Sequence, residues 1–376
     1  MSMTSFQFDP SLTREFIDFG YSLYRDDRRR IPPIRRSVAR QFSPDYPFYN
    51  KQGNGHKHFL AYQGRRVVGR VSAMVNAALR DHDGTAVGLI GFYECREDEA
   101  AAAALLDAAR NWLREEHGLR RIWGPMNFDT WHGYRFLTKG FDRAPFYGEP
   151  DNKSYYPDQF ERYGFVRRRT WNSIEISGRP QLESLIARGK DPYALLLDRG
   201  YRFVPPGGPD RRNDLRKLHA LISRSFDGFL GFTPIAFEEF ERLFDRLRHA
   251  LARPMSMFIY DEADRLVGFG VTLYELSEAV RAMKGRDHPL SLAKFLFYRR
   301  RARRLNFFAA GVVPEERAKG TGIGKAGLYY VVDRALRHGC QDIIFALMAK
   351  ENRVQGLFRQ AGLDAQREYA LYELNI

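Results

Sequence analysis

The feature that most constrains the fold of this chain is an order of strands and helices that occurs twice. The second half predicts strand, strand, strand, helix, strand, helix and strand over 255–262, 266–274, 305–313, 322–338, 342–348, 351–361 and 367–375. The first half predicts a hairpin, strand, helix, strand, helix and strand over 58–76, 86–95, 97–117, 120–124, 155–163 and 168–176. Because strands alternate with helices in both halves, the expected fold class is α/β, with an α+β mixed sheet in two tandem units.

The length of 376 residues suits two domains, and 44% hydrophobic residues allow each a core. The expected units are 1–176 and 201–376, the second opening with a short strand at 201–204 and a mostly helical region at 210–252. The segment 177–200 is the expected linker. Cys95 and Cys340 imply no disulfide framework. With no signal peptide or membrane span in sight, we expect a cytoplasmic protein.

The charge of the chain is strongly basic, with a formal net charge of +14. Arginines cluster within 25–36, 167–169 and 299–304. This balance indicates anionic partners, such as a phosphate-bearing cofactor, nucleic acid, an acidic carrier protein or an anionic lipid surface, or else a generally basic surface. Beyond charge there is no RNA-binding signature, so nucleic acid is not favoured.

The most specific signal is a glycine-rich turn between a strand and a helix, VVPEERAKGTGIGKAGL (312–328). Its glycines allow backbone amides to approach phosphate oxygens, and the helix start adds a favourable dipole. The expected phosphate contacts are Gly320, Gly322, Gly324, Arg317, Lys319 and Lys325. The turn lacks the GKS or GKT of a Walker A loop and the final spacing of a dinucleotide fingerprint. A glycine-rich turn without a ligand is the alternative.

The pattern P-x-x-R-x-x-G-x-G, formed by Pro314, Arg317, Gly320 and Gly322, resembles the pyrophosphate loop of the GCN5-related N-acetyltransferases, the GNAT superfamily. In that family the loop amides hold the CoA pyrophosphate. The preceding strand splays from its neighbour, and its backbone N–H polarises the thioester carbonyl. The resemblance therefore implies two tandem GNAT-like domains, acyl-CoA as the donor and no metal.

Further positions carry over from the same resemblance. It places Val312 and Val313 beside the thioester, and it matches Asn352 to the asparagine that lies along the pantetheine arm. Phe358 stands where the family often has a tyrosine general acid, and a phenyl ring cannot donate a proton. The tyrosines able to replace it are Tyr329, Tyr369 and Tyr372, unless they are packing residues. The base candidates are Glu275 and Glu94.

The first half lacks the phosphate loop, because acidic residues (97–99) follow its strand FYEC. We expect a degenerate copy that binds the acceptor, since GPMNFDTWHGYRF (124–136) and PFYGEPDNKSYY (145–156) are typical of binding loops. His132 is a candidate base, or a histidine with a structural hydrogen bond. The acceptor candidates are Asn127, Trp131 and Tyr134, followed by Asp151 and Asn152.

GPMNF followed by WHGYR, beside the second-half loop, resembles a family of tandem bacterial acyltransferase-like proteins that includes bacterial ceramide synthases. That resemblance implies a fatty acyl donor and a sphingoid-base amine. The insertion 276–304 carries Leu290, Leu292, Phe295, Leu296 and Phe297 before its arginines. It suits an anionic inner-membrane surface or an acidic acyl-carrier protein; a helix packed on its own domain is the alternative.

The sequence thus predicts transfer of an acyl group, most sharply a long-chain fatty acyl group, from acyl-CoA or acyl-carrier protein to a hydrophobic primary amine. The active site is expected in a crevice between the halves. Three alternatives stay open: acetylation of a small polar amine or peptide, tRNA-dependent aminoacyl transfer of the peptidoglycan-bridge type, and a non-catalytic acyl-CoA sensor. The CoA-type loop argues against the tRNA-dependent alternative.

Overall fold

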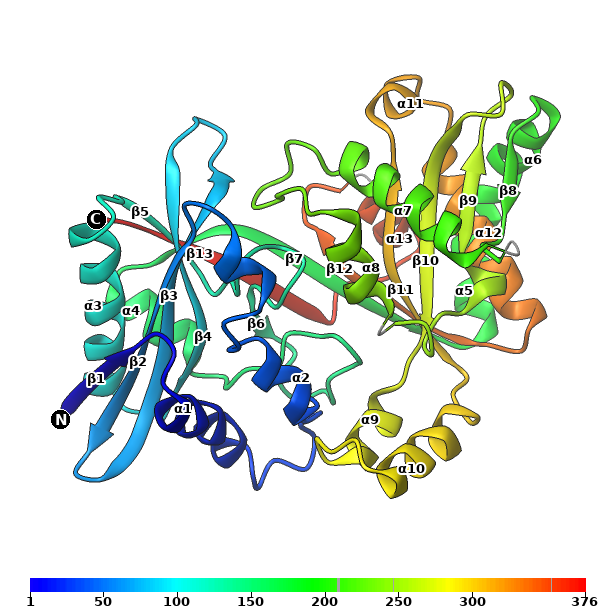
Figure 1. The fold of residues 1–376 in the computed structure, drawn as a ribbon. Helices are drawn as coiled ribbons and strands as arrows, with labels where there is room; N and C mark the ends of the chain where they lie inside the picture. Colours follow the sequence, from blue (N-terminus) through cyan, green and yellow to red (C-terminus); the bar gives the residue numbers. More distant parts are fainter. Residues whose placement is uncertain (208–209, 246, 353) are drawn as a thin grey trace.

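A computed structural model of the protein describes residues 1–207, 210–245, 247–352 and 354–376, without the side chain of Arg188. Its strands form one mixed sheet that runs across the molecule in the order β1-β2-β3-β4-β5-β13-β7-β12-β11-β10-β9-β8, with β6 beside β13 (Figure 1). The expected mixed α/β fold is confirmed. Positions 246 and 353, within the helical segments expected over 210–252 and 351–361, lie outside the described residues.

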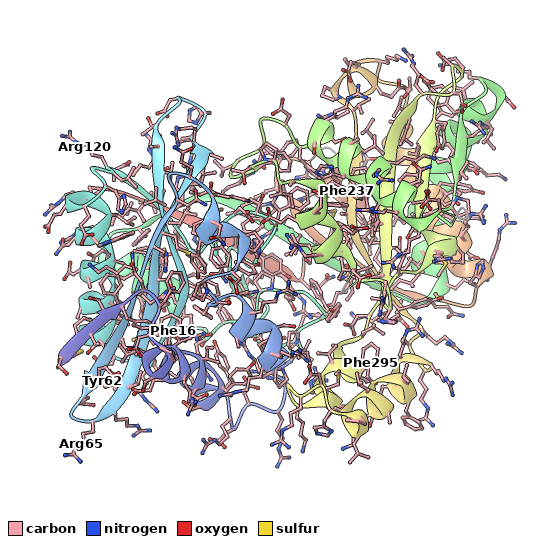
Figure 2. The ribbon with its side chains drawn as sticks, viewed as in Figure 1. Phe16, Tyr62, Arg65, Arg120, Phe237 and Phe295 are labelled. Carbon is pink, nitrogen blue, oxygen red and sulfur yellow. The ribbon has the colours of Figure 1, made fainter. Side chains whose placement is uncertain are left out.

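The first half contains β1 (Ser2–Phe6), α1 (Pro10–Leu23), α2 (Arg35–Arg40), β2 (Gly55–Gln63), β3 (Arg66–Arg80), β4 (Ala86–Cys95), α3 (Glu99–Glu115), β5 (Arg121–Gly124), β6 (Phe136–Lys139), α4 (Tyr156–Tyr163) and β7 (Val166–Ser177). Asp98 caps α3 by accepting from the amide of Ala101. The inner face of α3, around Leu105, packs on β2 and β3. On the opposite side of these strands, Phe16 of α1 is fully buried (Figure 2).

The second half contains α5 (Arg179–Ile186), α6 (Lys190–Asp198), β8 (Arg202–Val204), α7 (Arg211–Ser225), α8 (Phe237–Asp245), β9 (Met257–Tyr260), β10 (Leu266–Tyr274), α9 (Ser277–Met283), α10 (Pro289–Arg299), β11 (Arg304–Val312), α11 (Pro314–Ala318), α12 (Ile323–Arg337), β12 (Asp342–Ala349), α13 (Gln355–Gln360) and β13 (Arg367–Asn375). The expected linker, 177–200, is mostly helical. Its helices α5 and α6 bury Leu182 and Leu196 and pack against α12.

The two halves exchange their last strands. β7 pairs antiparallel with β12, as in Ile176 opposite Ile343, and β13 pairs antiparallel with β5, as in Tyr372 opposite Gly124. The exchanged strands β13 and β7 also pair with each other. Each half therefore completes its sheet with a strand from the other, and the sheet continues through the centre of the molecule.

The insertion between β10 and β11 forms α9 and α10, which lie beyond the ends of these two strands, on the same side of the molecule as α2 (Figure 1). Among the described helices, none combines the length and apolar character needed to cross a bilayer.

Candidate active site

The expected phosphate loop lies between β11 and α12. Gly320 and Gly322 have φ of 64° and 80°, a left-handed backbone that glycine adopts at no steric cost. Gly322 caps α12 without a side-chain acceptor, so the amides of Ile323 and Gly324 meet no partner within the described parts of the chain. A helix start of this kind presents N–H donors and partial positive charge to an anion.

The basic residues expected beside the loop divide into two groups. Arg317 and Lys325 line the same cleft as the loop glycines. Lys319 does not line it. Its ammonium pairs at 2.7 Å with Glu316, a buried carboxylate that needs a cation. Asn352 does line the cleft, and its Oδ1 accepts from the amide of Val354 at 3.0 Å.

The strands that precede the loop separate in the middle. β11 and β12 pair in parallel from Arg304–Asp342 to Phe307–Phe345 and then lose their register, although both continue for several residues. Leu347 of β12 has φ of 53° and donates its amide to Ser173 of β7. The far halves of β11 and β12 therefore leave a gap whose backbone groups face the cleft.

Val312 and Val313, both expected beside the thioester, have different surroundings in the structure. The amide of Val313 donates to the carbonyl of Val267 on β10 at 2.9 Å, and Val313 is buried in the core. Because successive amides of a strand point to opposite sides, the Val312 amide faces away from β10 and toward the gap. Val312 also lines the cleft, so it remains the candidate donor to a thioester carbonyl, whereas Val313 is a packing residue.

Both halves line one cleft of about 2490 Å³ that starts at the phosphate loop. The first half contributes β4 and the two segments expected to form binding loops, and the second half contributes the gap between β11 and β12. One side is apolar and is formed by side chains of α8, the turn after it, β9, β10 and β11: Leu243, Phe244, Leu247, Met257, Ile259, Phe269, Phe307 and Phe308. The cleft can thus accept both a phosphate-bearing group and a hydrocarbon chain.

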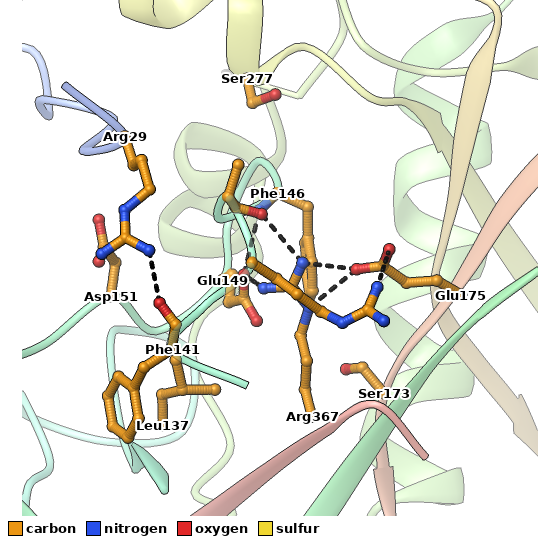
Figure 3. A network of polar contacts seen from close by, with 12 residues as sticks. Arg29, Leu137, Phe141, Phe146, Glu149, Asp151, Ser173, Glu175, Ser277 and Arg367 are labelled. Carbon is orange, nitrogen blue, oxygen red and sulfur yellow. Dashed lines mark hydrogen bonds and ion pairs between the residues drawn. The ribbon is translucent and has the colours of Figure 1, made fainter. Parts of the chain in front are cut away.

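A carboxylate from the first half, Glu149, lines the cleft. It accepts from Arg367 at 2.8 Å and from the Phe146 amide at 3.1 Å (Figure 3). It also accepts from the Tyr369 hydroxyl. Phe146 packs on Ile344 and Ala346 of β12. The loop that carries Glu149 therefore lies against β12, and its carboxylate is held by two residues of β13.

Burial raises the pKa of Glu149 to about 7, although Arg367 and the Tyr369 hydroxyl favour its ionised form. A carboxylate with this pKa can accept a proton near neutral pH. Tyr369, a candidate acid, has its pKa raised well above its usual value by burial and by Glu149. Tyr369 therefore keeps its proton and orients Glu149. The sequence pointed to this loop but not to Glu149.

His132 is held between two partners. Its Nδ1 lies 2.6 Å from Asp129 Oδ1, and its Nε2 lies 2.6 Å from the Tyr46 hydroxyl. The ring lines the cleft, but both nitrogens are engaged. His132 therefore has the structural hydrogen bonds expected of one alternative, and it also stays a candidate base in the cleft.

Glu94, the second base candidate, also lines the cleft, at the side formed by β4. Its Oε2 accepts from the hydroxyls of Tyr24 at 2.9 Å and Tyr156 at 2.6 Å. Its Oε1 lies 4.0 Å from Arg30 and 3.8 Å from Arg70. Glu94 is therefore the centre of a buried polar network in the first half.

Three residues considered for catalysis lie elsewhere, as does Phe358, which stands where the family often has a tyrosine. Glu275 accepts from the amide of Tyr147 at 2.7 Å and from the Ser277 amide and hydroxyl, and it does not line the cleft. It fastens the Glu149 loop to the start of α9. The other three pack against neighbours: Tyr329 on Tyr193, Tyr372 against Glu161, and Phe358 on Phe345.

The acceptor candidates Asn127, Trp131 and Tyr134 all line the cleft. Trp131 also joins the halves, because its indole N–H donates to the carbonyl of Thr233 at 2.8 Å. Of the two further candidates, Asn152 pairs with the backbone of Leu137 and Asp151 pairs with Arg30.

Arg135, which the sequence did not single out, also lines the cleft. Its guanidinium lies over the rings of Tyr134 and Trp171, at 3.9 and 4.5 Å from their centres. Its buried Nε and Nη1 have no hydrogen-bond partner among the described residues. The neighbouring side chains cover both atoms, so Arg135 lines the cleft without exposing these two donors to it.

No known family model matches the chain. Protein YghO of Escherichia coli (strain K12) is 25% identical over 293 residues, which cover 76% of this chain and 71% of that protein. A bacterial ceramide synthase of Caulobacter vibrioides is 24% identical over 293 residues, which cover 77% and 74%.

Solved structures establish the fold. A tandem GNAT protein from the clavulanic acid biosynthesis pathway matches with a TM-score of 0.51 and 13% identity over 100% of this chain and 98% of its own. A probable N-acyltransferase from Enterococcus faecalis V583 gives 0.53, with 9% identity over 100% and 73%. A GCN5-related glucosamine N-acetyltransferase region of a fungal multi-domain β-N-acetylglucosaminidase gives 0.57, with 13% identity over 99% of this chain but only 38% of that one. The expected fold of two tandem GNAT-like units is confirmed.

Proposed function

We propose that the protein is an N-acyltransferase that takes an acyl group from acyl-CoA and passes it to a primary amine in the cleft between its halves. One observation carries the proposal. The unpartnered amides of the phosphate loop and the carboxylate of Glu149 belong to different halves, yet both lie in the lining of one cleft. A donor site and a proton acceptor are thereby brought together.

Each part of the site has a role in this reaction. Acyl-CoA supplies an activated thioester. The loop amides, Arg317 and Lys325 hold the pyrophosphate, and the Val312 amide polarises the carbonyl. Glu149 takes the proton that the amine loses as its nitrogen bonds the carbonyl carbon, and it returns a proton to the sulfur as the C–S bond breaks.

For the substrates we propose a long-chain acyl group and a hydrophobic amine, in the sharpest form a sphingoid base, so that the product is a ceramide. The apolar side of the cleft has the character needed to hold a hydrocarbon chain. The similarity to a protein named bacterial ceramide synthase supports the same choice.

Calorimetry with acetyl-CoA and palmitoyl-CoA tests the proposal, using the wild type and Gly322→Trp. Tight binding of palmitoyl-CoA that is lost in Gly322→Trp would support both the donor site and the long chain. A preference for acetyl-CoA would overturn the lipid substrate and favour a small polar amine. If neither thioester binds, the acyl-CoA proposal is wrong.

A further inference from the structure

The helix α10 turns its apolar side chains outward. The residues that face the protein are spaced by four: Ser291 is buried, and Phe295 and Arg299 are half-buried. Phe295 packs against the second-half core (Figure 2). Five other large apolar residues of α10 are exposed, at 72% for Leu290, 46% for Leu292, 49% for Leu296, 50% for Phe297 and 38% for Tyr298. A helix folded only onto its own domain would have the opposite pattern.

Basic residues surround this apolar face. Residues 277–303 contain eight lysines and arginines, including Lys294 within α10, and two acidic residues, Glu278 and Asp287. The side chains of Arg300, Arg301 and Arg303 are exposed at the end of α10. Exposed apolar side chains bordered by arginines are typical of segments that lie in an anionic lipid interface.

A second arginine cluster lies beside the first, although the two are far apart in the sequence. The amide of Arg35 donates to the carbonyl of Gly285 at 2.9 Å, and the guanidinium of Arg281 donates to the carbonyl of Arg29 at 3.1 Å. The arginine-rich segment 25–36 is therefore continuous with α9 and α10. Residues from both segments also line the cleft: Arg25, Arg28, Arg30, Arg281 and Lys284.

We propose that this face, made of α9, α10 and residues 25–36, docks on an anionic phospholipid bilayer, with the exposed side chains of α10 inserted among the lipids. The two clusters carry like charge, and an anionic surface that faces both of them offsets their mutual repulsion. The docked orientation places the basic end of the cleft against the bilayer, where a hydrophobic amine can enter from the lipid. The docking itself does not depend on acyl transfer.

Vesicle co-sedimentation tests the docking. The samples are the full chain, the variant Leu290→Ser/Leu296→Ser/Phe297→Ser, and the charge variant Arg300→Glu/Arg301→Glu. The vesicles are phosphatidylcholine alone or an equal mixture of phosphatidylcholine and phosphatidylglycerol. We expect the wild type to bind the anionic vesicles, less strongly as salt is added, and both variants to bind at least about tenfold more weakly.

The matched control is Leu195→Ser/Leu197→Ser on α6, where two leucines are comparably exposed, at 47% and 43%. This control should bind anionic vesicles as the wild type does, and palmitoyl-CoA calorimetry on all variants shows that the cleft is intact. Binding by the α10 variants equal to that of the wild type would overturn the proposal. So would an absence of vesicle binding combined with α10-dependent binding of purified acyl-carrier protein.

Discussion

The helices α3 and α12 follow equivalent strands in the two halves but begin in opposite ways. At α3, the carboxylate of Asp98 accepts from the Ala101 amide, and Glu99 adds negative charge in the first turn. At α12, Gly322 holds the same position with no side chain, and the first amides stay unpartnered within the described chain. The start of α3 is therefore capped by a side chain of the protein, whereas the start of α12 has amides that can bind an anion.

The two halves also differ in the gap that follows the paired part of the equivalent strands, β4 and β11. In the first half, the side chain of Asn127 accepts from the Phe92 amide on β4 at 2.7 Å, and the Met126 amide donates to the Ile90 carbonyl. The first-half strand therefore satisfies its backbone with its own connection. The corresponding gap in the second half opens into the cleft. A duplicated fold can thus keep its architecture while one copy fills the strand gap with its own side chain and the other leaves the gap open.

The largest effect on the reaction rate is expected from replacing Glu149, the proposed base of the first half. Glu149→Gln should lower kcat by about 10²- to 10⁴-fold, because the amide cannot accept the proton, while palmitoyl-CoA affinity stays unchanged. In the wild type, the rate should fall as pH falls through about 7, where Glu149 becomes protonated. Steady-state kinetics across pH check both points. Glu161→Gln, in the first half but outside the cleft lining, is the control; a fully active Glu149→Gln would exclude the proposed base.

Making the second half resemble the first should abolish donor binding. Gly322→Asp places a carboxylate where Asp98 stands in the first half, and its charge repels a pyrophosphate. We expect acyl-CoA affinity, measured by calorimetry, to fall at least about a hundredfold. Gly339→Asp, at a turn with a similar φ of 74°, controls for backbone strain. Equal losses in the two variants would mean that strain, not charge, was responsible.

The two basic residues that flank the loop should differ in their effect on affinity. Arg317→Ala should weaken acyl-CoA binding about tenfold, because it removes a charge-assisted contact within the cleft. Lys319→Ala should change the dissociation constant by less than about twofold, since Lys319 does not line the cleft and its ammonium pairs with Glu316. If Lys319→Ala caused the greater loss of affinity, our assignment of the phosphate contacts would have to be reversed.

The smallest effect should come from replacing Asp98, the residue that caps α3. Asp98→Ala should lower the free energy of unfolding by about 1 kcal/mol in urea denaturation, through the lost cap of α3. The affinity for acyl-CoA should not change. A change in affinity would show that the first half also takes part in donor binding.

Local patterns predicted most of the secondary structure and the phosphate loop, since the loop's chemistry depends on neighbours within a few residues. They did not predict the exchange of β7 and β13, because either strand could pair with either half. Glu149 was missed for a related reason: its partners Arg367 and Tyr369 lie 218 and 220 residues away. On α10, the sequence placed Phe295 on one apolar face with its neighbours, whereas the structure turns it inward.

The strand exchange has a consequence for synthesis in the cell. Trp123 of β5 donates to Glu373 of β13, its partner 250 residues later in the chain. While the ribosome makes the intervening residues, β5 has an unpaired edge, and β7 is made before both of its neighbours. The first half cannot complete its sheet during translation until β13 has emerged. An arrested nascent chain would therefore expose strand edges prone to aggregation, and a chaperone that covers them would increase the yield of folded protein.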